Sequence, residues 1–189
     1  MTSRLPEIPY EEWDFEALAE ISPGMKPPPL NVVAFFAHHP DLAKRFLSWN
    51  RYVNGSSSTL PRRARELAVL RVAWRKRSKY EWAQHLMIAR RAGVSTDEIA
   101  QLRGAAPATG LAALMIAAVD ELTDGTALSE RTYRALAAEF SERQLLDLVF
   151  LIGTYALLSM AFNAFRLDLD PGLTAEGFDI TPEPSQKGT

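Results

Sequence analysis

Helical periodicity with clear start signals is the feature that most restricts what this chain can fold into. Apolar residues recur at three- and four-residue spacing, and Ser95-x-x-Glu98 and Ser141-x-x-Gln144 are capping boxes, in which two side chains satisfy free backbone amides at a helix start. No segment combines alternating apolar and polar residues with β-branched enrichment, as strands do. The sequence therefore predicts an all-α protein.

Proline, glycine and capping residues set the expected helix boundaries. Pro61 suits a first helical turn, because its missing N–H costs nothing there, and Gly93 suits a C-terminal cap. We expect residues 1–30 to be a wrapped N-terminal extension, 31–169 a single helical domain and 170–189 a C-terminal tail. The expected helices are residues 11–21, 31–37, 41–53, 59–77, 78–92, 95–102, 111–122, 129–140 and 141–165.

Composition excludes several classes of function. A net charge of −2 gives no electrostatic case for binding nucleic acid, and the absence of cysteine excludes disulfides, thiolate metal sites and thiol chemistry. The N-terminus lacks the apolar run of a signal peptide, and the longest apolar region, residues 145–165, is interrupted by Asp147 and Asn163. We therefore expect no membrane partner and a cytoplasmic location.

The charge is unevenly distributed along the chain. Residues 62–91 contain ten basic and two acidic residues, whereas the rest contains 11 basic and 21 acidic residues. This asymmetry fits either an anionic ligand near the central helices or oppositely charged surfaces that meet in an oligomer.

The two acids of the basic segment, Glu66 and Glu81, occur with His85. Glu81 and His85 are four residues apart, so they share a helix face. Three interpretations remain open: a structural hydrogen bond, a carboxylate that orients a general acid/base histidine, or a pair of metal ligands. Glu66 is either buried and paired, or bound to Arg62 at the surface.

Structural explanations compete with a site. Ser78-x-x-Glu81 also matches the pattern of a capping box. A glutamate that caps its own helix cannot at the same time be the full hydrogen-bond partner of His85. His38 and His39 precede Pro40, and we expect them to end a helix. At most one of the two could join Glu66, Glu81 and His85 in a divalent-metal site, and only if the fold brings these side chains together.

Three segments resemble a known family. The patterns R-x-x-E-L-x-x-L-R-V-A-W, Y-E-W-x-Q-H and A-R-R-A-G-V-S-x-x-E-I, within residues 61–102, resemble the carboxymuconolactone decarboxylase superfamily, which includes the alkylhydroperoxidase D-like (AhpD-like) proteins. Residues 145–169 resemble the closing helix of that family more loosely. The resemblance implies that residues 31–169 form an AhpD-like helical bundle and that the protein is a homo-oligomer.

The thiol branch of this superfamily uses a Glu and a Cys-x-x-Cys-x-x-x-His proton relay. On this chain the relay ends fall on Glu66 and His85, and the two cysteine positions fall on Ser78 and Glu81. Neither residue performs thiol redox chemistry, so we expect no thiol peroxidase activity. In the decarboxylase branch, the resemblance implies that His85 protonates the carbon left by loss of carbon dioxide.

These observations predict a carboxymuconolactone decarboxylase-like enzyme, a cofactor-independent acid/base lyase or isomerase on a small, anionic, cyclic substrate. Glu66, Glu81 and His85 are the expected catalytic residues, and we expect Trp82 and Tyr155 to contact the substrate. No metal is predicted in this leading hypothesis. The alternatives are a non-catalytic ligand-binding or assembly protein on the same fold, and a divalent-metal site at Glu66, Glu81 and His85.

Overall fold

The computed structural model describes residues 3–104 and 106–178, which form helices and no strand. This confirms the all-α prediction. The elements are a 3-10 turn, η1 (Tyr10–Glu12), followed by α1 (Asn31–Ala37), α2 (Pro40–Asn54), α3 (Arg62–Arg75), α4 (Lys79–Arg91), α5 (Thr96–Leu102), α6 (Gly110–Gly125), α7 (Glu130–Glu139) and α8 (Glu142–Phe165).

Helix α3 forms the centre of the core. It packs against α4, α5, α6 and α8, and its residues from Ala64 to Leu70 are all buried. A helix that is enclosed on all sides needs apolar residues around its whole circumference, and α3 has them. Two charged residues, Arg65 and Glu66, are buried in this helix nonetheless, which identifies the place where a polar site can lie.

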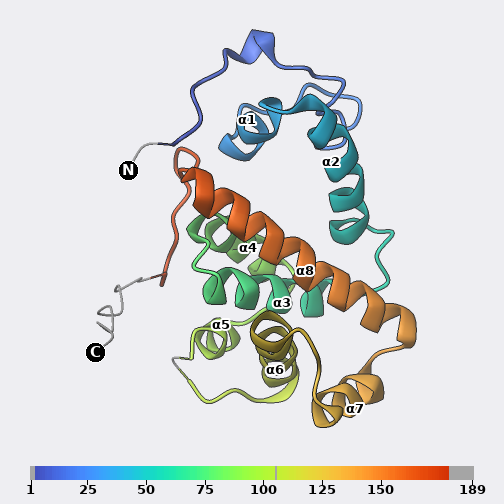
Figure 1. Cartoon of the computed structure of the whole chain (residues 1–189). Helices are drawn as coiled ribbons and strands as arrows, with labels where there is room; N and C mark the ends of the chain where they lie inside the picture. The colour runs from blue at the N-terminus through green and yellow to red at the C-terminus, as the bar shows by residue number, and fades with distance from the viewer. Residues whose placement is uncertain (1–2, 105, 179–189) are drawn as a thin grey trace, which may run out of the picture.

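Helix α8 crosses the molecule and separates two groups of helices (Figure 1). Helices α1 and α2 lie on one side of it, and α3 to α7 lie on the other. Among the described residues, α8 is long and apolar enough to cross a membrane, with a mean hydropathy of 2.0. Here it is a core helix, because half of that apolar window is buried and α8 packs against α3.

The caps that the sequence predicts for α5 and α8 are present. Ser95 with Glu98, and Ser141 with Gln144, make both hydrogen bonds of a capping box. Gly93 follows α4 with a φ of +82°, a conformation that favours glycine. His39 lies before α2, and its Nδ1 accepts from the Leu42 amide, so this histidine is a helix cap.

The helix expected over residues 11–21 is wrong. The structure has only the 3-10 turn of Tyr10–Glu12 and then a series of turns. Asp14 supplies a physical reason, because its carboxylate accepts from the Ala17 amide at 3.0 Å and so competes with helical hydrogen bonding. The N-terminal extension is nonetheless anchored, since Trp13 and Leu18 are buried in the core.

The chain beyond α8 is packed as far as it is described. Asp170 accepts from the Asn31 amide at the start of α1, and Phe178 packs its ring against Trp74 and Trp82. Residues 166–178 therefore tie the start of α1 to the outer side of α4. Residues 179–189 of the predicted tail lie outside the described residues.

Much of the positive charge of residues 62–91 is neutralised within the chain. Arg63 pairs with Glu98, Arg71 with Asp120, and Arg75 with Asp124. The acids come from α5 and α6, so the asymmetry seen in the sequence largely describes how neighbouring helices of one chain attract each other.

Candidate functional site

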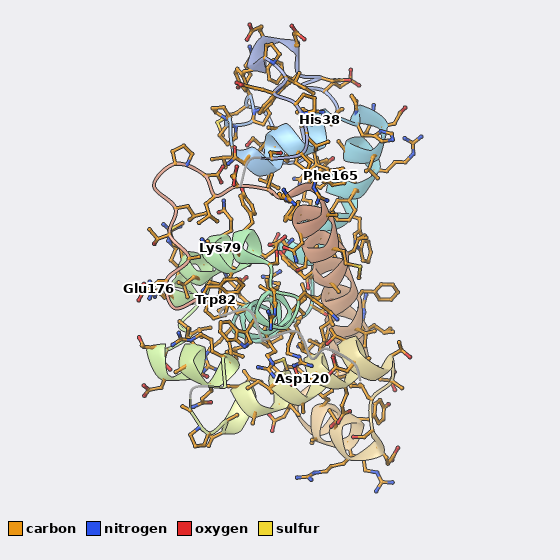
Figure 2. The ribbon with its side chains drawn as sticks, turned by 60° about the vertical axis from the view of Figure 1, so that its left-hand side comes forward. His38, Lys79, Trp82, Asp120, Phe165 and Glu176 are labelled. Atoms are coloured by element: carbon orange, nitrogen blue, oxygen red, sulfur yellow. The ribbon has the colours of Figure 1, made fainter. Side chains whose placement is uncertain are left out.

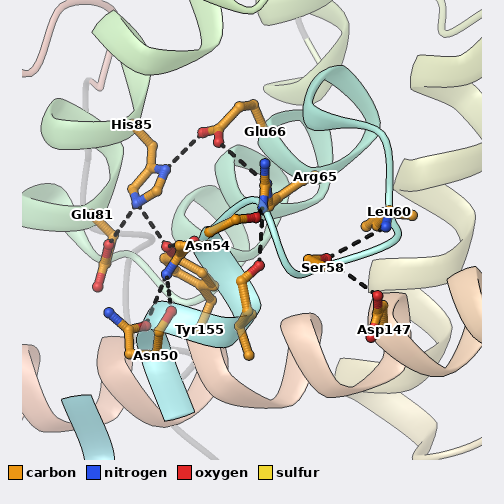
Figure 3. Close-up of polar contacts among 12 residues, drawn as sticks. Asn50, Asn54, Ser58, Leu60, Arg65, Glu66, Glu81, His85, Asp147 and Tyr155 are labelled. Atoms are coloured by element: carbon orange, nitrogen blue, oxygen red, sulfur yellow. Dashed lines mark hydrogen bonds and ion pairs between the residues drawn. The ribbon is translucent and has the colours of Figure 1, made fainter. Parts of the chain in front are cut away.

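Glu66, Glu81 and His85 converge, as the sequence predicted that they would if they formed a site. Glu66 Oε2 lies 2.8 Å from His85 Nδ1, and Glu81 Oε2 lies 3.6 Å from His85 Nε2 (Figure 3). The imidazole is therefore flanked by a carboxylate from α3 and another from α4. All three side chains are buried, and Glu66 is only 3% exposed.

Glu81 does not cap its own helix. Ser78 occupies the N-cap position of α4 but makes no side-chain cap hydrogen bond, and its buried hydroxyl has no hydrogen-bond partner among the described residues. The Ser78-x-x-Glu81 capping box is therefore wrong, and Glu81 faces His85 instead. The surface alternative for Glu66, a pair with Arg62, is excluded by its burial.

Tyr155 from α8 and Asn54 from α2 complete the network. The Tyr155 hydroxyl lies 3.0 Å from His85 Nε2 and donates to Asn54 Oδ1 at 2.7 Å. Asn54 Nδ2 donates in turn to the backbone carbonyl of Asn50 at 3.2 Å and to its side-chain oxygen at 2.9 Å. Four helices thus contribute to one chain of hydrogen bonds (Figure 3).

This chain of hydrogen bonds fixes the protons on His85. The carbonyl of Asn50 can only accept, so the Asn54 amide must present its nitrogen to Asn50 and its oxygen to Tyr155. The Tyr155 hydroxyl then donates its single proton to Asn54. Its oxygen can therefore only accept a hydrogen bond from His85 Nε2. An ionised Glu66 also only accepts, from Nδ1. Both ring nitrogens donate, so His85 is held as an imidazolium.

The electrostatics of the buried groups agree with this assignment. Burial alone lowers the pKa of His85, but the hydrogen bond and charge of Glu66 and the charge of Glu81 outweigh burial and raise it above 6.5, against an opposing effect of Arg65. Burial raises the pKa of Tyr155 well above 10, so its hydroxyl keeps its proton. The positive charge on His85 itself is therefore stable in this site.

The carboxyl group of Glu81 titrates near neutral pH. Burial raises its pKa to about 7, and the negative charge of Glu66 adds to this, while the positive charge of His85 works in the opposite direction. A carboxyl group with a pKa near the working pH is suited to give and take protons.

A cavity of about 370 Å³ opens onto Glu81, His85 and Tyr155. This volume lies within the roughly 300–1,000 Å³ of typical ligand pockets. Most of its wall is apolar, and its polar lining comes from these three residues together with Glu20, Asn50, Arg51, Asn54, Tyr80 and Gln84. Glu66 lies behind His85 and does not line the cavity.

Trp82, which we expected to contact a substrate, does not line the cavity. Its side chain is fully buried on the other side of α4, where the indole N–H donates to the Glu176 carbonyl at 2.9 Å. Figure 2 shows Trp82 and Glu176 together on that side. Trp82 thus holds the chain beyond α8, whereas Tyr155 does line the cavity.

Among the described residues, no group of three or more His, Asp or Glu side chains is placed to hold a metal ion. The reason is geometric: Glu66 and Glu81 lie on opposite nitrogens of His85, so the ring separates them. His38 and His39 are not part of the cavity lining.

No sequence pattern pointed to Asn50, Asn54 or Gln84 as site residues. Asn50 and Asn54 are four residues apart at the end of α2, which is the only local sign that they share a face. Their role depends on how α2 packs beside α8, and no spacing within either helix reveals this.

The geometry allows a direct comparison with known proteins. Residues 40–124 match the carboxymuconolactone decarboxylase family. This segment runs from α2 to α6 and includes Glu66, Glu81 and His85. The family resemblance read from the sequence is therefore confirmed, and the chain lacks the cysteine pair of the thiol branch. The comparison with curated proteins gives no match.

Two solved structures share the fold. The first is the alkylhydroperoxidase AhpD core of an uncharacterized peroxidase-related protein from Ralstonia eutropha JMP134, with a TM-score of 0.74 and 17% identity over 89% of this chain and 93% of that chain. The second is an uncharacterized peroxidase-related protein from Silicibacter sp. TM1040, with a TM-score of 0.71 and 16% identity over 94% of this chain and 96% of that chain. The fold is AhpD-like.

Proposed function

We propose that this carboxymuconolactone decarboxylase-like protein is a proton-transfer enzyme, a cofactor-independent lyase or isomerase of a small, cyclic, anionic substrate. The observation that carries the proposal is the network that holds His85 as a two-donor cation next to Glu81, whose pKa is raised to about 7. Acid/base enzymes place a titrating group of this kind beside a fixed charge. The absence of cysteine argues against thiol peroxidase chemistry.

Glu81 is the proposed general acid and base. In a decarboxylation, the bond from the substrate carbon to its carboxylate breaks, carbon dioxide leaves, and the electron pair remains as an enolate. Protonated Glu81 then delivers its proton to that carbon. In an isomerisation, ionised Glu81 takes a proton from one carbon and returns it to another. This assignment moves the proton-transfer role from His85, where the family resemblance placed it, to Glu81.

His85 is the proposed electrostatic partner of the reaction. As an imidazolium it stabilises the negative charge that develops on the enolate oxygen, and its position is fixed by Glu66 on one nitrogen and Tyr155 on the other. Because these contacts exist before a substrate binds, little reorganisation is needed when the charge forms.

Arg51 is the proposed contact for the substrate's carboxylate. It lines the cavity and pairs with Glu20 at 2.9 Å, in a partly exposed position. A substrate carboxylate can replace Glu20 on the guanidinium group, as arginine binds carboxylates with two parallel hydrogen bonds. The apolar remainder of the wall, with Phe36 and Phe162, suits the carbon ring of a cyclic acid.

The proposal is tested by proton exchange in D₂O. The protein is incubated with a panel of small cyclic carboxylic acids that carry an acidic C–H or a carboxylate beta to a carbonyl, and deuterium uptake and carbon dioxide release are measured by mass spectrometry. We expect turnover of at least one acid, a loss of more than about 100-fold in Glu81→Gln, since general acid/base catalysis contributes this much, and an unchanged rate in Met87→Ala, on the exposed side of α4.

Turnover that persists in Glu81→Gln would refute the role of this residue. If no acid is turned over although one binds, as measured by calorimetry, the non-catalytic ligand-binding alternative is favoured. Arg51→Gln should raise KM with little change in kcat, which separates substrate binding from proton transfer.

A further inference from the structure

Helix α8 has two apolar faces, and residues 3–104 and 106–178 cover only one of them. Its inner face carries buried residues such as Leu151, Tyr155 and Phe162. Its outer face carries a row of exposed positions, which we call the outer stripe: Leu146, Val149, Phe150, Gly153, Leu157, Met160 and Ala164. A helix that is apolar all round is normally buried all round, so the outer stripe lacks a partner among the residues that the structure describes.

The outer stripe contains no charged residue along its full length. Its large side chains are strongly exposed: Leu146 by 60%, Met160 by 59%, Phe150 by 55% and Leu157 by 53%. Trp49 and Tyr52 of α2 extend the patch on one side, and the Trp49 ring lies 5.6 Å from the Phe150 ring. Contiguous apolar surface of this kind marks an interaction site.

Four large residues of the outer stripe are placed symmetrically about its glycine. Leu146 and Met160 lie seven residues on either side of Gly153, and Val149 and Leu157 lie four residues on either side. If a second α8 crosses antiparallel with Gly153 on a twofold axis, Leu146 of one copy faces Met160 of the other, and Val149 faces Leu157. Such self-matching is what a twofold interface requires, because the same patch serves both partners.

Gly153 itself is unexplained within one chain. A glycine inside a helix costs about 1 kcal/mol relative to alanine, yet a Cβ at this position would meet nothing within 4 Å. Packing among the described residues of one chain therefore does not require it. A second helix that crosses at this point does, since the absence of a side chain lets two backbones approach closely.

The available area is sufficient for a specific contact. With its large side chains about half exposed, the outer stripe and its two flanking rings offer roughly 600 Å² per copy, so that two copies reach the roughly 1,200 Å² at which stable interfaces begin. We infer that α8 is the interface between two copies of this chain, paired antiparallel about Gly153. The family resemblance predicts a homo-oligomer, and this inference names the surface and the symmetry.

Cysteine cross-linking gives the sharpest test, because the chain has no cysteine of its own. Gly153→Cys puts two thiols face to face on the axis, and we expect it to form a disulfide-linked dimer under mild oxidation at least tenfold faster than Met87→Cys, which is on the exposed side of α4. Equal rates for the two variants would overturn the inference. Because the native cysteine count is zero, every cross-link reports the introduced residue.

Molar mass by light scattering provides the second test. Wild type should have a mass of twice 21.0 kDa, or an even multiple of it. Leu157→Arg should halve that mass, while Leu42→Arg, at an exposed leucine of α2, should not change it. A monomeric wild type, or a Leu157→Arg variant of unchanged mass, would refute the interface. A wild-type monomer that sediments with phosphatidylcholine vesicles would assign the outer stripe to lipid instead.

Discussion

Oε2 of Glu66 lies 2.8 Å from Nδ1 of His85, although nineteen residues separate them in the chain. The contact joins α3 to α4 in the interior of the protein, and it places a carboxylate behind the ring while the other ring nitrogen faces Tyr155 and Glu81. The charge state of His85 therefore depends on partners from α3, α4 and α8, and, through Asn54, on α2.

Glu66→Gln should destabilise the fold and lower the pKa of His85. The glutamine amide lacks the negative charge that pairs with the buried imidazolium. Removing one partner of a buried ion pair lowers the free energy of unfolding by roughly 3 kcal/mol. Urea unfolding and the NMR titration of His85 measure the two effects. Glu130→Gln, which breaks the exposed pair with Arg134, is the matched control and should leave stability unchanged. Equal stability of both variants would contradict the buried ion pair.

Stability should fall as pH rises, in two separable steps. The pKa of Glu81 is about 7 in the folded protein and 4.5 ordinarily, so the folded state holds this proton more tightly. The stabilisation is complete below pH 4.5 and is lost as pH rises toward 7, by roughly 3 to 4 kcal/mol at 1.4 kcal/mol per pKa unit. Glu81→Gln should abolish this step in unfolding curves recorded between pH 4.5 and 8.

The second step belongs to His85. Its pKa is raised above 6.5, so its stabilisation is complete below pH 6.5 and is lost as pH rises through the higher folded pKa. This step should survive in Glu81→Gln and disappear in His85→Gln. An unfolding free energy that rises with pH between 5 and 8 would contradict both pKa assignments.

The sequence predicted the fold better than the site. Capping boxes at Ser95 and Ser141 and the apolar run of α8 are local signals, and local signals place helices. The pairing of Glu66 with His85 was expected only because a family resemblance joined them. Packing between α3 and α4 decides which of their faces meet. The spacing of residues within one helix does not predict this contact.

Trp82 shows where helical reasoning fails. Trp82 precedes His85 by three residues and Glu81 precedes it by four. Glu81 nevertheless faces the cavity, whereas Trp82 does not. One helical residue corresponds to a rotation of about 100°, so neighbouring positions point to different surroundings. Ring contacts of Trp82 with Trp74 and Phe178 decide its direction, and Phe178 is far away in the sequence.

Asn54→Ala should lower the pKa of His85 although the two residues do not touch. Without the Asn54 oxygen, the Tyr155 hydroxyl is free to donate to His85 Nε2, which stabilises the neutral ring with its proton on Nδ1. Histidine ¹⁵N chemical shifts distinguish the two states, because a ring nitrogen without a proton resonates far downfield. Wild type should show two protonated nitrogens at pH 6, below the ordinary histidine pKa of 6.5, and Asn54→Ala should show more of the singly protonated ring at the same pH.

Tyr155→Phe supplies the control for this assignment. The effect of Asn54 is transmitted through the tyrosine hydroxyl, so Asn54→Ala should change nothing further in a Tyr155→Phe background. Additive effects of the two substitutions would mean that Asn54 acts on His85 by another route.

Ser78 and Ser95 occupy the same position before their helices, and their substitution by alanine should have different results. Ser95 makes both bonds of a capping box, and the loss of such a cap costs about 1 kcal/mol. The Ser78 hydroxyl is buried, and no other residue in the described part of the chain forms a hydrogen bond with it. Its removal therefore takes away a polar group whose burial is not compensated by a hydrogen bond. Ser78→Ala should therefore leave the unfolding free energy unchanged or raise it. A loss as large as that of Ser95→Ala, measured by urea unfolding at pH 7, would show that Ser78 caps α4 after all.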